Sequence, residues 1–289
     1  YSNVTTPPSL ALHPSDGTKS TDLAQSTLAG FKTFGVQFAE LMYVPAQDGF
    51  QLPVALTKPR NFDPSKKYPV IVNVYGGPSA PQVSNSFRFG AVWENVLGNE
   101  GYICMTVDNR AATAISKNLE NLLLKRTPGE IELNDLVDAV RWMKTQPWVD
   151  PDRIGLWGWS GGGTNTLLGM TRSTEFKAGI AGAGVTDFRF YDTKWGEAMM
   201  KTEKENLEGY ETNSLIQFAK DMHGKVLIIH NTHDDNVHIQ NSWRFINELI
   251  KADILFELMS YPMRGHGVGD PAGRQHLNHL MLDFWKRNL

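Results

Sequence analysis

Cysteine is nearly absent from this chain, since Cys104 is the single cysteine among 289 residues. No disulfide can form within the chain, which suits a reducing cytoplasm and equally a periplasmic or secreted protein that is stable without disulfides, the location we favour. Long apolar runs are also lacking, because no stretch approaches the roughly 18 residues needed to cross a bilayer. The formal net charge is only −3, so the basic excess typical of nucleic-acid-binding proteins is missing and we expect no nucleic-acid partner.

The composition that remains is ordinary for a globular protein, with 41% hydrophobic and 20% charged residues. Residues 1–35 differ from the rest because they are rich in Ser, Thr, Pro and Gly. We interpret them as the remnant of an N-terminal β module and a linker, and residues 36–289 as one α/β catalytic domain. The chain begins at Tyr1, so we expect a processed or trimmed piece of a longer product.

Alternating patterns predict the elements of the larger domain. Residues 38–44 and 51–57 flank Asp48-Gly49 and indicate an N-terminal antiparallel hairpin. Further strands are predicted at residues 70–74, 102–107, 153–157, 178–183, 226–229 and 255–261, and helices at 92–97, 130–144, 164–171, 242–251 and 276–287. This alternation predicts an α/β fold, in which a mostly parallel central sheet has helices on both faces.

The segment Gly158-Trp159-Ser160-Gly161-Gly162 lies between a predicted buried strand and a predicted helix. A serine flanked by glycines in that context is typical of a nucleophile elbow, in which a tight turn exposes the hydroxyl. The helix that follows directs its free N–H groups toward the serine, where negative charge would develop. An inert glycine turn is the alternative interpretation.

A serine nucleophile needs a base and a group that orients the base, in the chain order Ser, acid, His. Asp234 and Asp235 follow the strand at 226–229, and we favour Asp234 as the acid. His266 lies between glycines just after the last predicted strand, where the base is expected. Solvated loop residues are the alternative for all three.

The loop after residue 229 also has the composition of a metal site. Its potential ligands are His230, His233, Asp234, Asp235 and His238. No H-E-x-x-H frame is present and the cluster follows a strand, so we expect no metal and no cofactor. We interpret His230 as structural and the pair His276 and His279 as part of a solvated helix face.

An oxyanion that forms on attack by Ser160 would need hydrogen-bond donors. The backbone N–H of Gly161 is one candidate. The loop Tyr75-Gly76-Gly77-Pro78 follows the first central strand and offers either a backbone N–H or the Tyr75 hydroxyl. A simple glycine turn is the alternative interpretation of that loop.

Taken together, these motifs resemble the catalytic domain of the prolyl oligopeptidase family of serine peptidases, in particular its dipeptidyl peptidase IV-like branch. The resemblance covers about residues 36–289 in family order. Its motifs are Val74-Tyr75-Gly76-Gly77-Pro78, Asp108-Asn109-Arg110, Gly158 to Gly162, Tyr191-Asp192 with Trp195, Asp234 to His238, and His266-Gly267.

The resemblance implies an α/β-hydrolase fold with Ser160, Asp234 and His266 as a catalytic triad. It implies that the Tyr75 hydroxyl and the Gly161 N–H bind the oxyanion. It further implies an apolar pocket for Pro or Ala at P1 of a peptide substrate, lined by Val185, Phe188, Tyr191, Trp195, Asn236 and Val237. Ordinary core packing is the alternative explanation of these pocket residues.

Departures from the family pattern limit the functional prediction. Relatives carry an N-terminal β-propeller that restricts substrate size, and this chain holds at most its last strand. Gly161 and Asn231 stand where relatives commonly have Tyr and Gly. We therefore predict a serine peptidase that acts through an acyl-enzyme and is dipeptidyl peptidase-like at full length. The alternatives are a carboxylesterase, an unrestricted small-peptide hydrolase, or a catalytically silent binding module. The apolar C-terminal helix is a candidate surface for a homodimer.

Overall fold

A computed structural model describes residues 2–25, 28–87 and 92–289. Its main feature is an eight-stranded sheet with the strand order β10-β9-β8-β7-β5-β6-β4-β3. These strands are β3 (Glu40–Pro45), β4 (Gln51–Thr57), β5 (Tyr68–Asn73), β6 (Ile103–Val107), β7 (Val149–Trp159), β8 (Ala178–Gly182), β9 (Lys225–Asn231) and β10 (Glu257–Tyr261). The six strands from β10 to β6 are parallel, whereas β4 and β3 add antiparallel at one edge. The predicted α/β fold and its N-terminal hairpin are confirmed.

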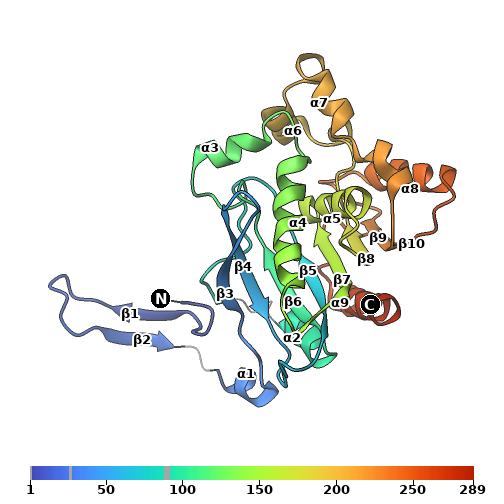
Figure 1. Ribbon diagram of the computed structural model, residues 1–289. Coiled ribbons are helices and arrows are strands. Elements are labelled where there is room, and N and C mark those ends of the chain that lie inside the picture. The colour runs from blue at the N-terminus through green and yellow to red at the C-terminus, as the bar shows by residue number, and fades with distance from the viewer. Residues whose placement is uncertain (1, 26–27, 88–91) are drawn as a thin grey trace.

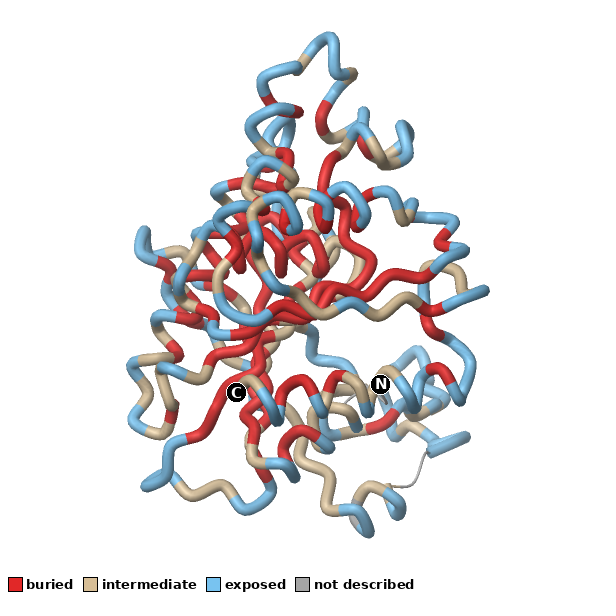
Figure 2. The backbone as a smooth tube through the Cα atoms, turned by 90° about the vertical axis from the view of Figure 1, so that its right-hand side faces the viewer, coloured by how far each residue is buried: buried red, intermediate tan, exposed pale blue. Residues whose placement is uncertain are grey.

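Helices cover both faces of the sheet because the central strands are apolar on both sides. On β5, Val70 and Val72 face one buried cluster while Ile71 faces the other. The first cluster includes α4 (Glu130–Lys144), α5 (Gly161–Arg172) and α8 (Gln240–Lys251), and the second includes α2 (Val92–Asn99) and α9 (Pro271–Asn288). Figure 2 shows the buried strands as a band between the two helical layers.

Short helices connect β8 to β9, a stretch for which the sequence predicts no elements. They are η3 (Phe188–Phe190), α6 (Thr193–Met200), η4 (Glu203–Glu205), α7 (Leu207–Thr212) and η5 (Leu215–Asp221). The other short helices are α1 (Ala29–Phe34), α3 (Lys117–Glu120) and η2 (Asn121–Leu123). The α6 and α7 helices lie at the top of the molecule in Figure 1. In the described ranges, no helix combines the length and the apolar character that spanning a membrane requires.

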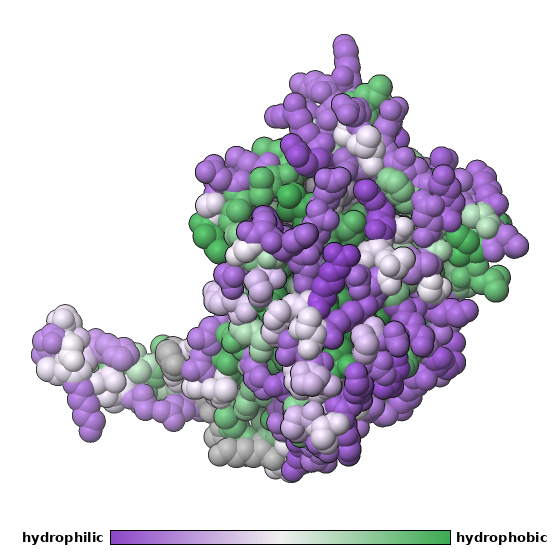
Figure 3. All heavy atoms as spheres, viewed as in Figure 1, coloured by the Kyte–Doolittle hydropathy of each residue, from purple (hydrophilic) through white to green (hydrophobic). Residues whose placement is uncertain are grey.

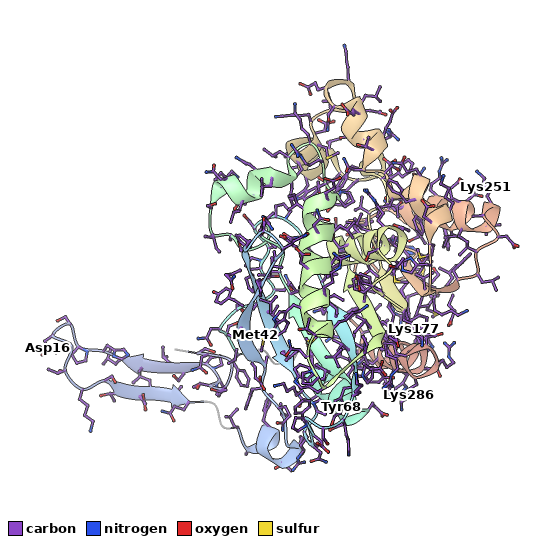
Figure 4. All side chains as sticks on the ribbon, viewed as in Figure 1. Asp16, Met42, Tyr68, Lys177, Lys251 and Lys286 are labelled. Atoms are coloured by element: carbon purple, nitrogen blue, oxygen red, sulfur yellow. The ribbon has the colours of Figure 1, made fainter. Side chains whose placement is uncertain are left out.

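The N-terminal segment forms a separate antiparallel ribbon of β1 (Ser9–Leu12) and β2 (Thr21–Gln25). The ribbon extends away from the main body, with Asp16 at its tip (Figures 3 and 4). Its strands pair with each other and most of their residues are exposed. The division at residue 35 into a β remnant and a catalytic domain stays a prediction.

Two helices begin three or more residues earlier than the sequence predicts. The α5 helix starts at Gly161 and not at residue 164, and α9 starts at Pro271 and not at residue 276. The Asp270 side chain caps α9 by accepting from the Gly273 N–H, and Pro271 occupies the first turn, where a missing N–H costs nothing. Both starts lack the apolar periodicity on which the prediction depends.

Candidate active site

Ser160 lies between the end of β7 and the start of α5, at a strained point of the backbone. Its φ of 60° and ψ of −121° fall in a region that residues with a side chain rarely adopt. The Ser160 N–H donates to the Gly182 carbonyl on β8 at 2.8 Å, and its own carbonyl accepts from the Thr164 N–H at 3.0 Å. Sheet and helix thus fix both sides of the turn, which leaves the Ser160 side chain half-buried at the strand end.

Close backbone packing explains the glycines around this turn. A Cβ on Gly158 or on Gly162 would overlap the Val74 carbonyl oxygen at the end of β5. Gly161 is different, because a Cβ there would lie 3.5 Å from the nearest atoms, an ordinary contact. The turn therefore requires glycine at 158 and 162 and tolerates a side chain at 161.

The predicted acid and base lie in direct contact. His266 Nδ1 lies 2.9 Å and 3.0 Å from the two carboxylate oxygens of Asp234. The Asp234 side chain is fully buried, and the N–H groups of Asn236 and Val237 donate to its Oδ1. Asp235 is exposed on the same loop, and within the described ranges it makes no hydrogen bond to His266. The structure therefore distinguishes two aspartates between which the sequence left a choice.

His230 supports the Asp234 carboxylate from the opposite side. Its Nε2 lies 2.8 Å from the Val237 carbonyl and 3.3 Å from Asp234 Oδ2, while its Nδ1 lies 2.7 Å from the Ser242 hydroxyl. Because Nε2 faces two acceptors, it carries the proton, and Ser242 donates to Nδ1. The sequence interpretation of His230 as structural did not identify this contact with the acid.

The electrostatics favour a charged acid at this position. Burial raises the pKa of Asp234, but hydrogen bonds from His230, His266 and the Val237 N–H outweigh burial and hold that pKa well below its usual range. A carboxylate that stays ionised can fix one tautomer of His266 and stabilise its protonated form.

Several hydrogen bonds hold the loop that carries His266. Asn231 at the end of β9 donates through Nδ2 to the Gly265 carbonyl at 2.6 Å, and the His233 N–H donates to the Arg264 carbonyl at 3.1 Å. Trp159 Nε1, one residue before Ser160, donates to the carbonyl of His266 at 2.7 Å. This last bond brings the serine turn and the histidine loop together, although in the described part of the chain no hydrogen bond joins Ser160 Oγ to the His266 ring.

Tyr75 packs against the first residue of α5. A Cβ on Gly161 would lie 3.5 Å from the Tyr75 Cζ, the carbon that bears the hydroxyl. As the first helical residue, Gly161 has an N–H without an intrahelical acceptor, at the positive end of the helix dipole. Two candidate oxyanion donors therefore lie close together beside Ser160.

Three aromatic side chains predicted to line a pocket form one cluster after β8. The ring centroids of Phe188 and Trp195 lie 5.3 Å apart, and Tyr191 lies 6.1 Å from Phe188 and 5.8 Å from Trp195. The Tyr191 hydroxyl donates to Asn236 Oδ1 at 3.0 Å, which joins the cluster to the loop of Asp234. Burial raises the pKa of Tyr191, and the charge of the adjacent Asp192 raises it further.

Val185 and Val237, the other two predicted pocket residues, are buried. The N–H and carbonyl of Val185 both bond to the Thr164 hydroxyl on α5, at 2.8 Å and 2.9 Å. Val237 lies in the loop that surrounds Asp234, where its N–H bonds to the carboxylate. Val185 is therefore held to the helix that follows Ser160, and Val237 to the carboxylate of Asp234.

The histidines considered as metal ligands have other partners. His230 is bonded as described above, His238 Nδ1 accepts from the Gln240 N–H, and His276 bonds to the Tyr261 hydroxyl at 2.9 Å. In the part of the chain that the structure describes, no group of three or more His, Cys, Asp or Glu side chains is placed to hold a metal ion.

Comparisons with known proteins show similarity to one family over most of the chain. The sequence profile of the prolyl oligopeptidase family matches residues 88–289. The "Probable dipeptidyl-aminopeptidase B" of Ajellomyces dermatitidis is 36% identical over 225 residues, which are 76% of this chain and 24% of that protein. The venom dipeptidyl peptidase 4 of Vespula vulgaris is 35% identical over 246 residues, which are 82% of this chain and 31% of that protein.

A crystal structure of dipeptidyl peptidase 4 from Porphyromonas gingivalis has a similar fold over the whole chain. Its TM-score is 0.93 at 34% sequence identity, and the match covers 100% of this chain and 41% of that one. The present chain therefore spans well under half the length of the proteins that it resembles.

Proposed function

The chain belongs to the prolyl oligopeptidase family, and on that premise we propose that it is the catalytic domain of a serine peptidase that cleaves after proline or alanine. The observation that carries the proposal is the contact of the buried Asp234 carboxylate with the His266 ring, whose loop Trp159 bonds to the strained turn of Ser160. A nucleophile, a base and an orienting carboxylate are the three parts that acyl transfer needs.

In the proposed mechanism, the Ser160 hydroxyl attacks the scissile carbonyl and His266 Nε2 takes its proton. Asp234 accepts from Nδ1–H, which keeps Nε2 free as the base and stabilises the imidazolium. The Tyr75 hydroxyl and the Gly161 N–H stabilise the oxyanion. Proton transfer from His266 to the leaving amine gives the acyl-enzyme, and a water activated by the same histidine hydrolyses it.

The aromatic cluster supports the proposed preference at P1. Phe188, Tyr191 and Trp195 present flat apolar surfaces near the acid loop, and such walls suit a proline ring or an alanine methyl. Hydrogen bonding between Tyr191 and Asn236 fixes one wall. Asn236, Val185 and Val237 complete the proposed pocket.

Restriction of the activity to dipeptide release is proposed for the full-length protein only. The relatives named as dipeptidyl peptidases are about two and a half to four times as long as the matched region, so the chain would work with a further domain. We propose an N-terminal β-propeller as that partner, which would hold the free N-terminus of the substrate and limit its size.

Hydrolysis of Ala-Pro-p-nitroanilide by the purified chain tests the proposal. Ser160→Ala is expected to lower kcat by about 10⁴- to 10⁶-fold because the nucleophile is lost. Acetyl and butyryl p-nitrophenyl esters serve as comparison substrates, and a strong preference for the anilide is expected. Near-normal turnover by Ser160→Ala would refute the assignment, and a preference for the esters would favour a carboxylesterase.

A further inference from the structure

A buried amide on α5 bonds to both residues that the proposed function assigns to the oxyanion. Asn165 Nδ2 donates to the Tyr75 carbonyl at 2.9 Å and to the Gly161 carbonyl at 3.1 Å. The opposite amide orientation would set Oδ1 against two carbonyl oxygens, so the hydrogen bonds fix the orientation. Tyr75 and Gly161 are 86 positions apart in the sequence, and this single side chain links their backbones.

We propose that Asn165 is a positioning residue that holds the Tyr75 hydroxyl and the Gly161 N–H in register as oxyanion donors. The inference rests on the proposed function, because it concerns how that site is assembled. No motif in the sequence indicates this role, since Asn165 lies one turn beyond the serine elbow on an otherwise ordinary buried helix face.

The Tyr75 loop needs such support because its two glycines restrict the backbone little. Gly76 has a φ of +80°, and the loop continues with a second glycine. Two amides hold it, since Asn165 bonds to the Tyr75 carbonyl and Asn109 Nδ2 bonds to the Gly76 carbonyl at 2.9 Å. Asn109 is itself locked by N–H donors from Ala111 and Ala112. Of these two amides, Asn165 is the one that lies on α5 and also bonds to the Gly161 carbonyl.

Stability alone does not explain an asparagine at this position. Asn165 is 5% exposed, and nothing in the described part of the chain donates to its buried Oδ1. An unpartnered buried acceptor costs stability. A threonine could satisfy the Gly161 carbonyl without that cost, as Thr166 Oγ1 does for the Gly162 carbonyl at 2.8 Å and Thr171 Oγ1 does for the Leu167 carbonyl at 2.7 Å. The longer asparagine adds the bond to Tyr75.

That bond matters because oxyanion donors act only when they are aimed at the developing charge. A small displacement of the Tyr75 ring from the Gly161 N–H would leave the ground-state complex intact and weaken contacts in the transition state. Loss of the Asn165–Tyr75 hydrogen bond should therefore lower kcat and leave KM nearly unchanged.

The test uses Asn165→Thr, which can keep the bond to the Gly161 carbonyl and cannot reach Tyr75. We expect kcat for Ala-Pro-p-nitroanilide to fall by about 10- to 100-fold, less than the loss of a whole oxyanion donor, with KM within about threefold. The smaller Asn165→Ser has the same expectation if threonine lowers the melting temperature. Thr166→Val is the matched control, because it removes a similar bond on the same helix without touching Tyr75, and its kcat should stay within about twofold.

A double-mutant cycle with Tyr75→Phe separates positioning from general destabilisation. If Asn165 acts through the Tyr75 hydroxyl, Asn165→Thr should cost less than about threefold in the Tyr75→Phe background. Additive losses, or an unchanged kcat in Asn165→Thr, would overturn the inference. Ser160→Ala distinguishes failure of this inference from failure of the proposed function. If it abolishes turnover while Asn165→Thr does not lower kcat, only the inference fails, and if it stays active, the proposed function fails.

Discussion

The charge of a single carboxylate shows how much of this site depends on individual side chains. Asp234 is fully buried yet held in its ionised form by three groups, the His230 and His266 rings and the Val237 N–H. Asp235, the next residue, points into solvent with none of these partners. Neighbouring residues of the same type thus have different chemistry because one faces the histidines and the other faces water.

This contrast predicts different outcomes for two conservative substitutions. Asp234→Asn should lower kcat by about 10³- to 10⁴-fold, because an amide no longer holds His266 in the tautomer that acts as a base. Asp235→Asn is the matched control and should change kcat by less than about threefold. Steady-state kinetics with Ala-Pro-p-nitroanilide measure both. A larger loss of kcat in Asp235→Asn than in Asp234→Asn would show that Asp234 is not the catalytic acid.

The lowered pKa of Asp234 also predicts how stability varies with pH. The folded-state pKa lies below the ordinary aspartate value of 3.8, so the folded protein binds fewer protons there than the unfolded chain. This contribution to the free energy of unfolding is fully present above about pH 5 and is lost as the pH falls through the folded pKa. Urea unfolding at pH 6 and pH 3 should show the wild-type free energy falling toward that of Asp234→Asn. If the difference in free energy of unfolding between wild type and Asp234→Asn were the same at both pH values, the account would be contradicted.

At the scale of elements, the serine turn between β7 and α5 takes its geometry from close packing against the backbone at the end of β5. The sequence identifies the turn correctly but predicts the helix from residue 164, because glycine is a poor helix former. The structure starts α5 at Gly161, since tertiary packing requires glycine where the Val74 carbonyl passes. Local propensity therefore misplaces the helix start at the point where the site is built.

Packing at this turn predicts a contrast between two adjacent glycines. Gly162→Ala should lower the free energy of unfolding by about 2–4 kcal/mol, because its Cβ would overlap a backbone oxygen that cannot move freely. Gly161→Ala should change it by less than about 1 kcal/mol, since the nearest atoms lie 3.5 Å away. Urea denaturation followed by circular dichroism measures both. Equal costs would mean that the backbone is not as tightly packed here as described.

Other elements show which patterns carry information in the sequence. Strongly apolar strands and amphipathic helices such as α4 and α8 are predicted well because their burial repeats regularly. The short helices between β8 and β9 have no such repeat, yet they carry Phe188, Tyr191 and Trp195. The contact of Asn231 with the Gly265 carbonyl joins residues that are far apart in the sequence and that only the folded chain brings together.

At the scale of the whole molecule, the ribbon of β1 and β2 stands apart from the body (Figure 1). Its leucines Leu10, Leu12 and Leu23 are 60%, 61% and 59% exposed. Apolar side chains left open on a paired ribbon suit our prediction that residues 1–35 are the remnant of a β module. The matched regions account for 24% to 41% of the length of the relatives compared, which leaves room for such a module.

The exposed ribbon should contribute little to the stability of the catalytic domain. Replacing Ser9–Gln25 with a short Gly-Ser linker is expected to shift the melting temperature by less than about 2 °C, because little apolar surface is buried there. Differential scanning calorimetry measures the shift, and kcat for the anilide should be unchanged. A fall of many degrees would show that the ribbon is an integral part of this domain.

The central claim is that Ser160 is a nucleophile activated by His266, and covalent labelling tests it most directly. The purified chain is treated with a fluorophosphonate, and the modified residue is located by mass spectrometry. The account predicts one stoichiometric adduct on Ser160, with labelling slowed by several orders of magnitude in His266→Ala. A protein that hydrolyses the anilide but carries no adduct on Ser160, or carries it on another residue, would contradict the account.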